Sequence, residues 1–199
     1  DSVVLRFATL DLVRNQWRTF TYDVDTVGAY KAVSSNSTIN VLAVNVEENS
    51  NRQPIPYKTP PGIDRVQELS NNGINLLQNE QAMSLQINGL EKHQSRAVFK
   101  TLNLDLRQYG EMSMFIHAES GLKQSPQLVN GQVAAVIRIG QDFLSNYYEI
   151  KIPLEITQFS STATAEEIWP DANSLNVILQ DRGQLKMRRD AATSNIAGF

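Results

Sequence analysis

The sequence predicts a mainly β protein with one or two short helices, and three observations support this prediction. Runs rich in β-branched and aromatic residues recur along the 199-residue chain, and such residues suit a pleated, half-buried surface. Clusters of glycine, proline, asparagine and serine separate these runs, as turns between strands require. Apolar residues at helical spacing occur only in two short stretches.

Eight runs have the character of strands. The clearest is "YYEIKIPLEI" (147–156), in which Ile150 and Ile152 alternate with Glu149 and Lys151, so that one face meets a core and the other meets water. Pro153 cannot donate to a strand ladder, which indicates an edge position or a bulge there. The other runs are 3–13, 39–48, 82–88, 96–106, 112–118, 132–140 and 174–180.

Two short helices are predicted beside these strands. The first begins at Asp64, which can cap it, and continues to Leu69. It follows the stretch "TPPG" (59–62), where two prolines give a stiff entry and Gly62 is expected to adopt a positive φ. The second helix lies in "ATAEEIW" (163–169) and ends before Pro170.

Many short strands with turns between them favour an antiparallel β-sandwich, jelly-roll-like or galactose-binding-like. The predicted organisation has four parts. Residues 1–58 form an N-terminal strand group that belongs to the same sandwich, and 59–78 form the Pro/Gly connector with its short helix. Residues 79–190 form the main sandwich, and 191–199 form a C-terminal tail.

Charge and composition exclude several classes of protein. The formal net charge is −3, whereas a general nucleic-acid binder needs a basic surface to neutralise phosphates, so no nucleic-acid partner is expected. The cations Lys186, Arg188 and Arg189 are interpreted as the surface end of a strand. The absence of cysteine excludes disulfides, thiol nucleophiles and cysteine metal sites. No apolar run is long enough for a transmembrane helix.

Catalytic signals are sparse. His93 lies in a polar turn, and His117 ends a strand-like run, where a rim or core position is the simpler interpretation. Neither a nucleophile elbow nor a phosphate-binding loop is present. Asp23 and Asp25 could contribute oxygen ligands to calcium, but a polar turn explains them equally well. We therefore predict no enzyme, and no catalytic, cofactor-binding or metal-binding residues.

Four stretches, taken in order, carry a resemblance to a known family. They are "VNVEEN" with "PIPYKTPPGIDR" (45–65), "NEQAMSLQINGLEKHQSRAVFKTLNLDLRQYGEMSMFIHAE" (79–119), "VIRIGQDFLSNYYEIKIPL" (136–154), and "IWP" followed by "LNVIL" (168–179). Together they resemble the SprA/Sov family, the gliding-motility and type IX secretion outer-membrane translocon protein of Bacteroidetes. The chain departs from the family pattern at Ala82 and at Gly110-Glu111.

The resemblance implies a segment of a much longer protein that is embedded in the outer membrane of a Gram-negative bacterium. The segment itself is expected to be soluble and to lie on the periplasmic or the extracellular side. It would serve as a non-catalytic structural or interaction domain of the translocon, with accessory proteins and transiting cargo as partners. The alternative is a carbohydrate-binding β-sandwich module of a bacterial cell-surface protein, which would require several exposed aromatic residues on one surface.

Overall fold

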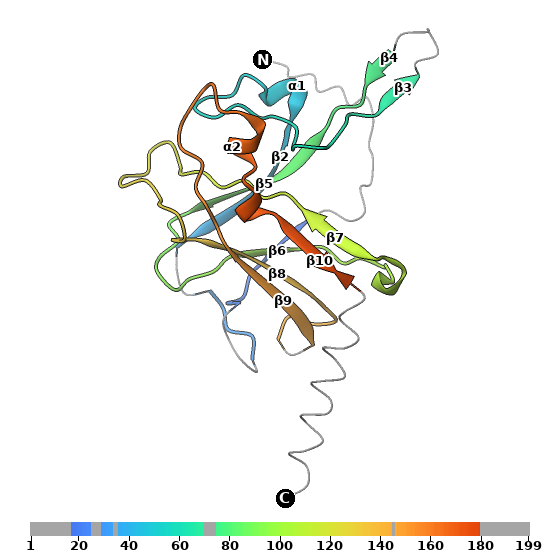
Figure 1. The fold of residues 1–199 in the computed structure, drawn as a ribbon. Helices are drawn as coiled ribbons and strands as arrows, with labels where there is room; N and C mark the ends of the chain where they lie inside the picture. Colours follow the sequence, from blue (N-terminus) through green and yellow to red (C-terminus); the bar gives the residue numbers. More distant parts are fainter. Residues whose placement is uncertain (1–16, 25–28, 34–35, 70–74, 145, 180–199) are drawn as a thin grey trace, which may run out of the picture. The chain divides into compact units, whose positions relative to one another are not determined.

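The computed structural model describes residues 17–24, 29–33, 36–69, 75–144 and 146–179 (Figure 1). The predicted strand run 3–13, residue Asp25, the basic cluster at 186–189 and the tail 191–199 lie outside the described residues.

The described residues confirm a mainly β fold with short helices. Their strands form five two-stranded sheets (Figure 1), and each of the four pairs with an assigned register is antiparallel. The sandwich and its jelly-roll topology stay predictions. The pairs are β1 (Arg18–Phe20) with β6 (Ala97–Phe99), β2 (Thr38–Asn45) with β5 (Gln81–Asn88), β3 (Gln67–Leu69) with β4 (Asn75–Leu77), β7 (Glu111–Met114) with β10 (Leu175–Ile178), and β8 (Ala134–Gly140) with β9 (Tyr147–Pro153).

The chain divides into two compact units. Unit 1 consists of Asp1–Leu42 and Leu85–Leu104, and unit 2 consists of Ala43–Ser84 and Asp105–Phe199. The division falls within β2 and within β5, so both strands continue from one unit into the other. The four predicted parts do not coincide with these units, and as domains they stay a prediction.

Unit 1 is organised around a strand pair and one bridge. β1 and β6 pair antiparallel with Phe20 opposite Ala97. Beyond β1, Tyr22 bridges to Ala32, and the backbone N–H of Asp23 donates to the carbonyl of Lys31 at 2.8 Å. Phe20 is the buried aromatic residue of this pair of strands.

The β8–β9 hairpin of unit 2 confirms the alternation read from residues 147–156. Ile150 pairs with Ile137 and is partly buried, as is Ile152, whereas Glu149 and Lys151 are exposed. In the described chain β9 has one neighbouring strand, so Pro153 occupies an edge strand, as its missing donor predicts. Arg138 and Glu149 form an ion pair across the two strands at 2.7 Å.

The segment after β9 is held by hydrogen bonds rather than by a sheet. Asn173 is completely buried. Its side-chain oxygen accepts from the Glu155 N–H at 2.8 Å, and its amide donates to the Glu155 carbonyl at 2.9 Å. The backbone N–H of Leu154 donates to the Val133 carbonyl, and that of Thr157 donates to the Ala118 carbonyl. The N–H of Ile156 donates to the side-chain oxygen of Asn130.

Two short α-helices are present in the described residues, α1 (Val46–Asn49) and α2 (Ala165–Ile168), with 3-10 turns η1 (Leu106–Gln108) and η2 (Asp171–Asn173). α2 confirms the helix predicted in 163–169. Its start is a capping box, in which the Thr164 hydroxyl accepts from the Glu167 N–H and the Glu167 carboxylate accepts from the Thr164 N–H.

The helix predicted from Asp64 to Leu69 is wrong. Residues 63–66 form no helix, and Gln67–Leu69 form β3, which pairs antiparallel with β4. Arg65 supports this pairing, because its side chain donates to the carbonyls of Leu77 and Gln78 at 3.1 and 2.8 Å. A six-residue helix has little stability of its own, so the strand pairing prevails.

Most of the predicted strand runs extend beyond the observed strands. Run 39–48 ends as β2 at Asn45, because the Asn45 side chain accepts from the Glu48 N–H at 2.8 Å and caps α1. Run 96–106 is reduced to β6, and run 112–118 to β7. Leu102 and Leu104 are exposed, so the apolar pattern of 96–106 overstated its burial.

Candidate functional site

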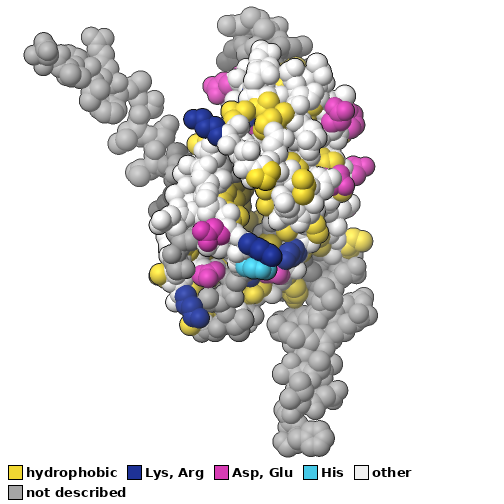
Figure 2. Space-filling model, turned by 90° about the vertical axis from the view of Figure 1, so that its left-hand side faces the viewer, with side chains coloured by type: hydrophobic (Ala, Val, Ile, Leu, Met, Phe, Trp, Pro, Cys, Tyr) yellow, Lys and Arg dark blue, Asp and Glu magenta, His cyan; other side chains and the backbone are white. Residues whose placement is uncertain are grey.

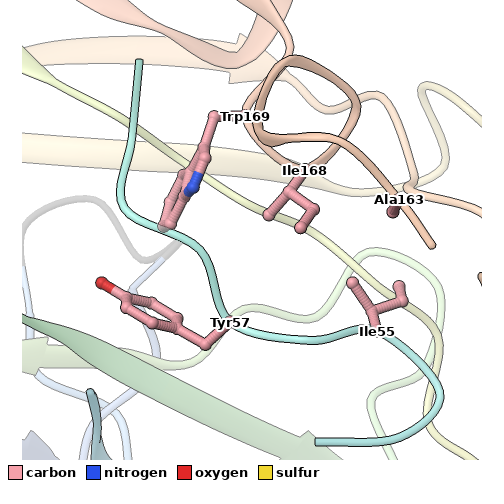
Figure 3. Close-up of a cluster of buried hydrophobic side chains, with 5 residues drawn as sticks. All are labelled: Ile55, Tyr57, Ala163, Ile168 and Trp169. Carbon is pink, nitrogen blue, oxygen red and sulfur yellow. The ribbon is translucent and has the colours of Figure 1, made fainter. Parts of the chain in front are cut away.

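Unit 2 has an aromatic-lined core built from two segments far apart in sequence. Ile55 and Tyr57 come from the extended chain after α1, and they face Ala163, Ile168 and Trp169 from the segment that contains α2 (Figure 3). The Tyr57 and Trp169 rings meet edge to face, with centroids 6.0 Å apart. The Trp169 indole N–H donates to the Lys58 carbonyl at 2.8 Å, so the polar atom of this buried ring is satisfied.

A polar network borders this core. Arg52 binds Glu119 through its two terminal guanidinium nitrogens. Nη1 lies 3.2 Å from Oε2, and Nη2 pairs with Oε1. The same carboxylate lies beside His117, whose Nε2 is 3.3 Å from Oε2. Arg52 also donates to the Ile55 carbonyl at 3.4 Å, and so connects the ion pair to the apolar core.

His117 is largely enclosed, and both of its ring nitrogens have partners. Nδ1 lies 2.8 Å from the Ile168 carbonyl and 3.2 Å from the Thr157 hydroxyl, and the ring stands edge-on to Trp169 at 5.9 Å. Burial lowers the pKa of His117 below its usual value. The bond to the Ile168 carbonyl opposes this effect, and the positive charge of Arg52 adds to it.

Tyr57 and Glu80 form a second, partly buried polar pair. The Tyr57 hydroxyl donates to the Glu80 carboxylate and lies 2.9 and 2.7 Å from its two oxygens. Burial raises the pKa of Tyr57, and the hydrogen bond to Glu80 and its negative charge raise it further. The Tyr57 hydroxyl therefore stays protonated at neutral pH and donates to Glu80.

Parts of three of the four sequence stretches that carry the family resemblance converge in this core. "PIPY" (54–57) supplies Ile55 and Tyr57, "NEQA" (79–82) supplies Glu80, "FIHAE" (115–119) supplies His117 and Glu119, and "IWP" (168–170) supplies Ile168 and Trp169. Ala82 and Phe115 also pack against the cluster. Stretches that are far apart in the sequence thus contribute residues to one packed and hydrogen-bonded centre.

This centre is suited to holding segments together. Thr157 is buried, and its hydroxyl also donates to the Glu167 carbonyl at 3.3 Å. The network joins the chain near Arg52, the 117–119 segment, Thr157 and the end of α2, so breaking one partner would leave buried polar groups unpaired. Sequence reasoning treated His117 as a rim or core residue, and the structure places it at the border of the core.

The other residues singled out from sequence lie apart from this network. His93 occupies an exposed turn and has a positive φ of 64°. Asp23 takes part in the backbone pairing with Lys31 in unit 1. The described residues contain no group of three or more His, Cys, Asp or Glu side chains that could hold a metal ion.

The partners of His117 were not predicted from the sequence, although one pattern could have indicated Glu119. His117 and Glu119 are two residues apart in an extended segment, which places both side chains on the same face. No comparable signal in the sequence connects them to Arg52.

The fold and this centre define a mainly β chain in which the core of unit 2 is bordered by a partly buried ion pair and by hydrogen bonds. A family model described as "motility related/secretion protein", SprA_N, matches residues 1–198. The chain therefore belongs to this motility and secretion family, which confirms the resemblance read from its sequence. No curated protein sequence matches the chain significantly. In the residues that the structure describes, every helix is too short or too polar to cross a membrane.

Proposed function

We propose that this chain is a non-catalytic structural or interaction domain of the type IX secretion translocon in the outer membrane, needed for protein export and gliding motility. Accessory proteins of the translocon and transiting cargo are its partners. The domain itself is soluble and lies on the periplasmic or the extracellular side of that membrane.

The observation that carries this proposal is the convergence of three of the four stretches that carry the resemblance in one packed centre. Membership of the motility and secretion family supplies the context. Within that context, Ile55, Tyr57 and Trp169 are enclosed, and His117 and Glu119 are bound to each other and to neighbouring segments. These residues serve mainly to keep the domain folded. A stably folded domain is suited to binding other components of the translocon.

The test is made in the parent protein, in cells that secrete a cargo with a type IX signal. Trp169→Ala breaks the centre, and we expect both cargo secretion and gliding to be lost. Tyr109→Ala removes a ring that is exposed in unit 2 and is the matched control; it should leave both unchanged. Normal secretion and gliding by a parent protein that lacks this domain would refute the proposal.

The non-catalytic part of the proposal needs its own variant. His117→Gln removes the imidazole but keeps a side chain that can donate and accept hydrogen bonds. We expect cells with this variant to secrete cargo whenever the parent protein reaches normal abundance. Loss of secretion at normal abundance and with a retained fold would show that His117 has a chemical role.

A further inference from the structure

Unit 1 contains an aromatic cluster separate from the centre described above. Phe20 lies in its middle, with ring centroids 5.8 Å from Tyr22, 6.2 Å from Tyr30 and 6.3 Å from Phe99. The rings of Tyr22 and Tyr30 are themselves 5.0 Å apart and inclined by 44°. Three of these contacts are edge to face, a geometry that aromatic pairs prefer.

The cluster is buried at its centre and open at its rim. Phe20 is 8% exposed, whereas Tyr22 and Tyr30 are 43% and 47% exposed. Within the described part of the chain, the hydroxyls of these two tyrosines have no hydrogen-bond partner, so their polar tips face water. Two exposed, touching aromatic rings with available hydroxyls are the composition of a recognition surface, because they offer apolar area and hydrogen bonds together.

The two tyrosines are held in place before any ligand arrives. Tyr22 bridges to Ala32, two residues beyond Tyr30, and the adjacent N–H of Asp23 donates to Lys31. This pairing puts Tyr22 and Tyr30 on the same side of the two segments. The Phe20 ring packs against both tyrosine rings. A preorganised pair loses little conformational entropy on binding.

Charge and spacing indicate the kind of ligand. Asp23 and Lys31 alternate with the tyrosines along their segments and so fall on the opposite side. Arg18 shares the aromatic side, but its guanidinium stacks over the Phe99 ring at 4.6 Å. A proline-rich peptide repeats its contacts about every 9 Å, which is too long for centroids 5.0 Å apart. A single pyranose ring, in contrast, is compact enough to contact two rings whose centroids are 5.0 Å apart.

We propose that Tyr22 and Tyr30 form a binding site for neutral saccharides. The slightly positive C–H groups on one face of a sugar ring pack on the electron-rich faces of the tyrosines, and the sugar hydroxyls bond to the tyrosine hydroxyls. This site is independent of the structural role proposed for unit 2.

The test is a titration of the chain with cellohexaose, mannohexaose and chitohexaose, followed through the tyrosine ring signals in NMR spectra. At least one of these saccharides should bind and shift the Tyr22 and Tyr30 signals. Tyr22→Ala and Tyr30→Ala should each weaken binding by about tenfold, the size of one lost aromatic contact. Tyr109→Ala, in unit 2, is the control of equal exposure and should bind as the unchanged chain does.

Tyr22→Phe and Tyr30→Phe guard against unfolding of unit 1, because they keep the rings and remove only the hydroxyls. They should retain the Phe99 ring signals and bind more tightly than the alanine variants. The proposal fails if none of the three saccharides binds at millimolar concentration, or if the alanine variants bind as well as the unchanged chain. It also fails if a decaproline peptide shifts these tyrosines while the saccharides do not.

Discussion

Trp169 connects the apolar and the polar parts of unit 2 through a single side chain. Its ring meets Tyr57, Phe115 and His117 edge to face at centroid distances of 6.0, 6.4 and 5.9 Å. Its N–H donates to the Lys58 carbonyl. A large aromatic residue with a satisfied polar atom contributes both burial and geometry, so this residue should be the most costly one to truncate.

We predict that Trp169→Ala lowers the free energy of unfolding by about 3–5 kcal/mol, because it leaves a large cavity and an unpaired Lys58 carbonyl. Urea denaturation followed by far-UV circular dichroism measures this change. Trp17→Ala removes an exposed tryptophan and should change the free energy by no more than about 0.5 kcal/mol. Equal effects of the two substitutions would contradict the assignment of Trp169 to the core.

His117 makes the stability of the folded chain depend on pH. Its folded-state pKa is lowered by burial, with Arg52 adding to the effect, whereas the unfolded chain keeps a value of about 6.5. Below that pH the unfolded state takes up the proton more readily than the folded state. The contribution of His117 is therefore present in full above about pH 6.5 and is lost as the pH falls towards the folded pKa.

Unfolding free energies at pH 7.5 and pH 5.5 test this prediction. The unchanged chain should be less stable at the lower pH, and His117→Gln should reduce the difference. His93→Gln changes a histidine in an exposed turn and should leave the difference as it is. An imidazole of His117 that titrates above its usual pKa in NMR spectra would show the opposite sign and overturn the argument.

How far single residues could be predicted depended on how local their interactions are. The rim or core position of His117 followed from its place at the end of a strand-like apolar run. The Arg52–Glu119 pair could not be predicted, because its partners are 67 residues apart and charge patterns indicate only local pairs. The exposed pair of Tyr22 and Tyr30 was equally hidden, since a tyrosine in sequence gives no sign of its burial.

At the scale of elements, the alternation in residues 147–156 was a reliable signal. Residues 147–153 form β9, in which exposed side chains alternate with partly buried ones as expected, and the strand ends at Pro153. The helix predicted in 163–169 is confirmed, and α2 ends before Pro170, the residue that predicted its end. The false helix at 64–69 rested on the capping residue Asp64 and on apolar spacing, and the Asn72-Gly73 pair that follows is instead a signal of a β-hairpin.

At Gly62 the backbone conformation of the connector itself favours glycine. Its φ is +76°, as the sequence predicts, and a Cβ added there would meet no atom within 4 Å. We predict that Gly62→Ala costs about 1–2 kcal/mol, entirely through left-handed backbone strain.

Thermal or urea unfolding measures that cost, and Gly110→Ala supplies the control. A Cβ at Gly110 also meets no atom within 4 Å, but the φ of Gly110 lies outside the left-handed range. Gly110→Ala should therefore be neutral or slightly stabilising. If both variants had the same stability, the strain at Gly62 would be disproved.

At the scale of the whole molecule, family membership was more accessible than architecture. Short stretches such as "PIPY" and "FIHAE" carried the resemblance to the family, and the structure places their residues in or beside the packed centre of unit 2. The division into two units within β2 and β5 has no composition change or linker to announce it, because it cuts through continuous strands.

The net charge of the whole chain predicts weak binding to nucleic acids. The chain carries 18 basic and 21 acidic residues, for a formal charge of −3. The face in Figure 2 shows acidic and basic side chains with hydrophobic ones between them. Arg52, Arg65 and Arg138 are already paired with glutamates. Because the net charge is negative and acidic side chains lie among the basic ones, we expect binding to duplex DNA to be weaker than about 100 µM at physiological salt.

Fluorescence anisotropy with a labelled duplex at several salt concentrations measures this affinity. The chain in which Lys186, Arg188 and Arg189 are replaced by alanine is the matched control, because it removes the densest basic cluster of the sequence. We expect neither chain to bind at physiological salt. Micromolar binding by the unchanged chain that is lost in the triple variant would show that this cluster is a polyanion site, against the argument from net charge.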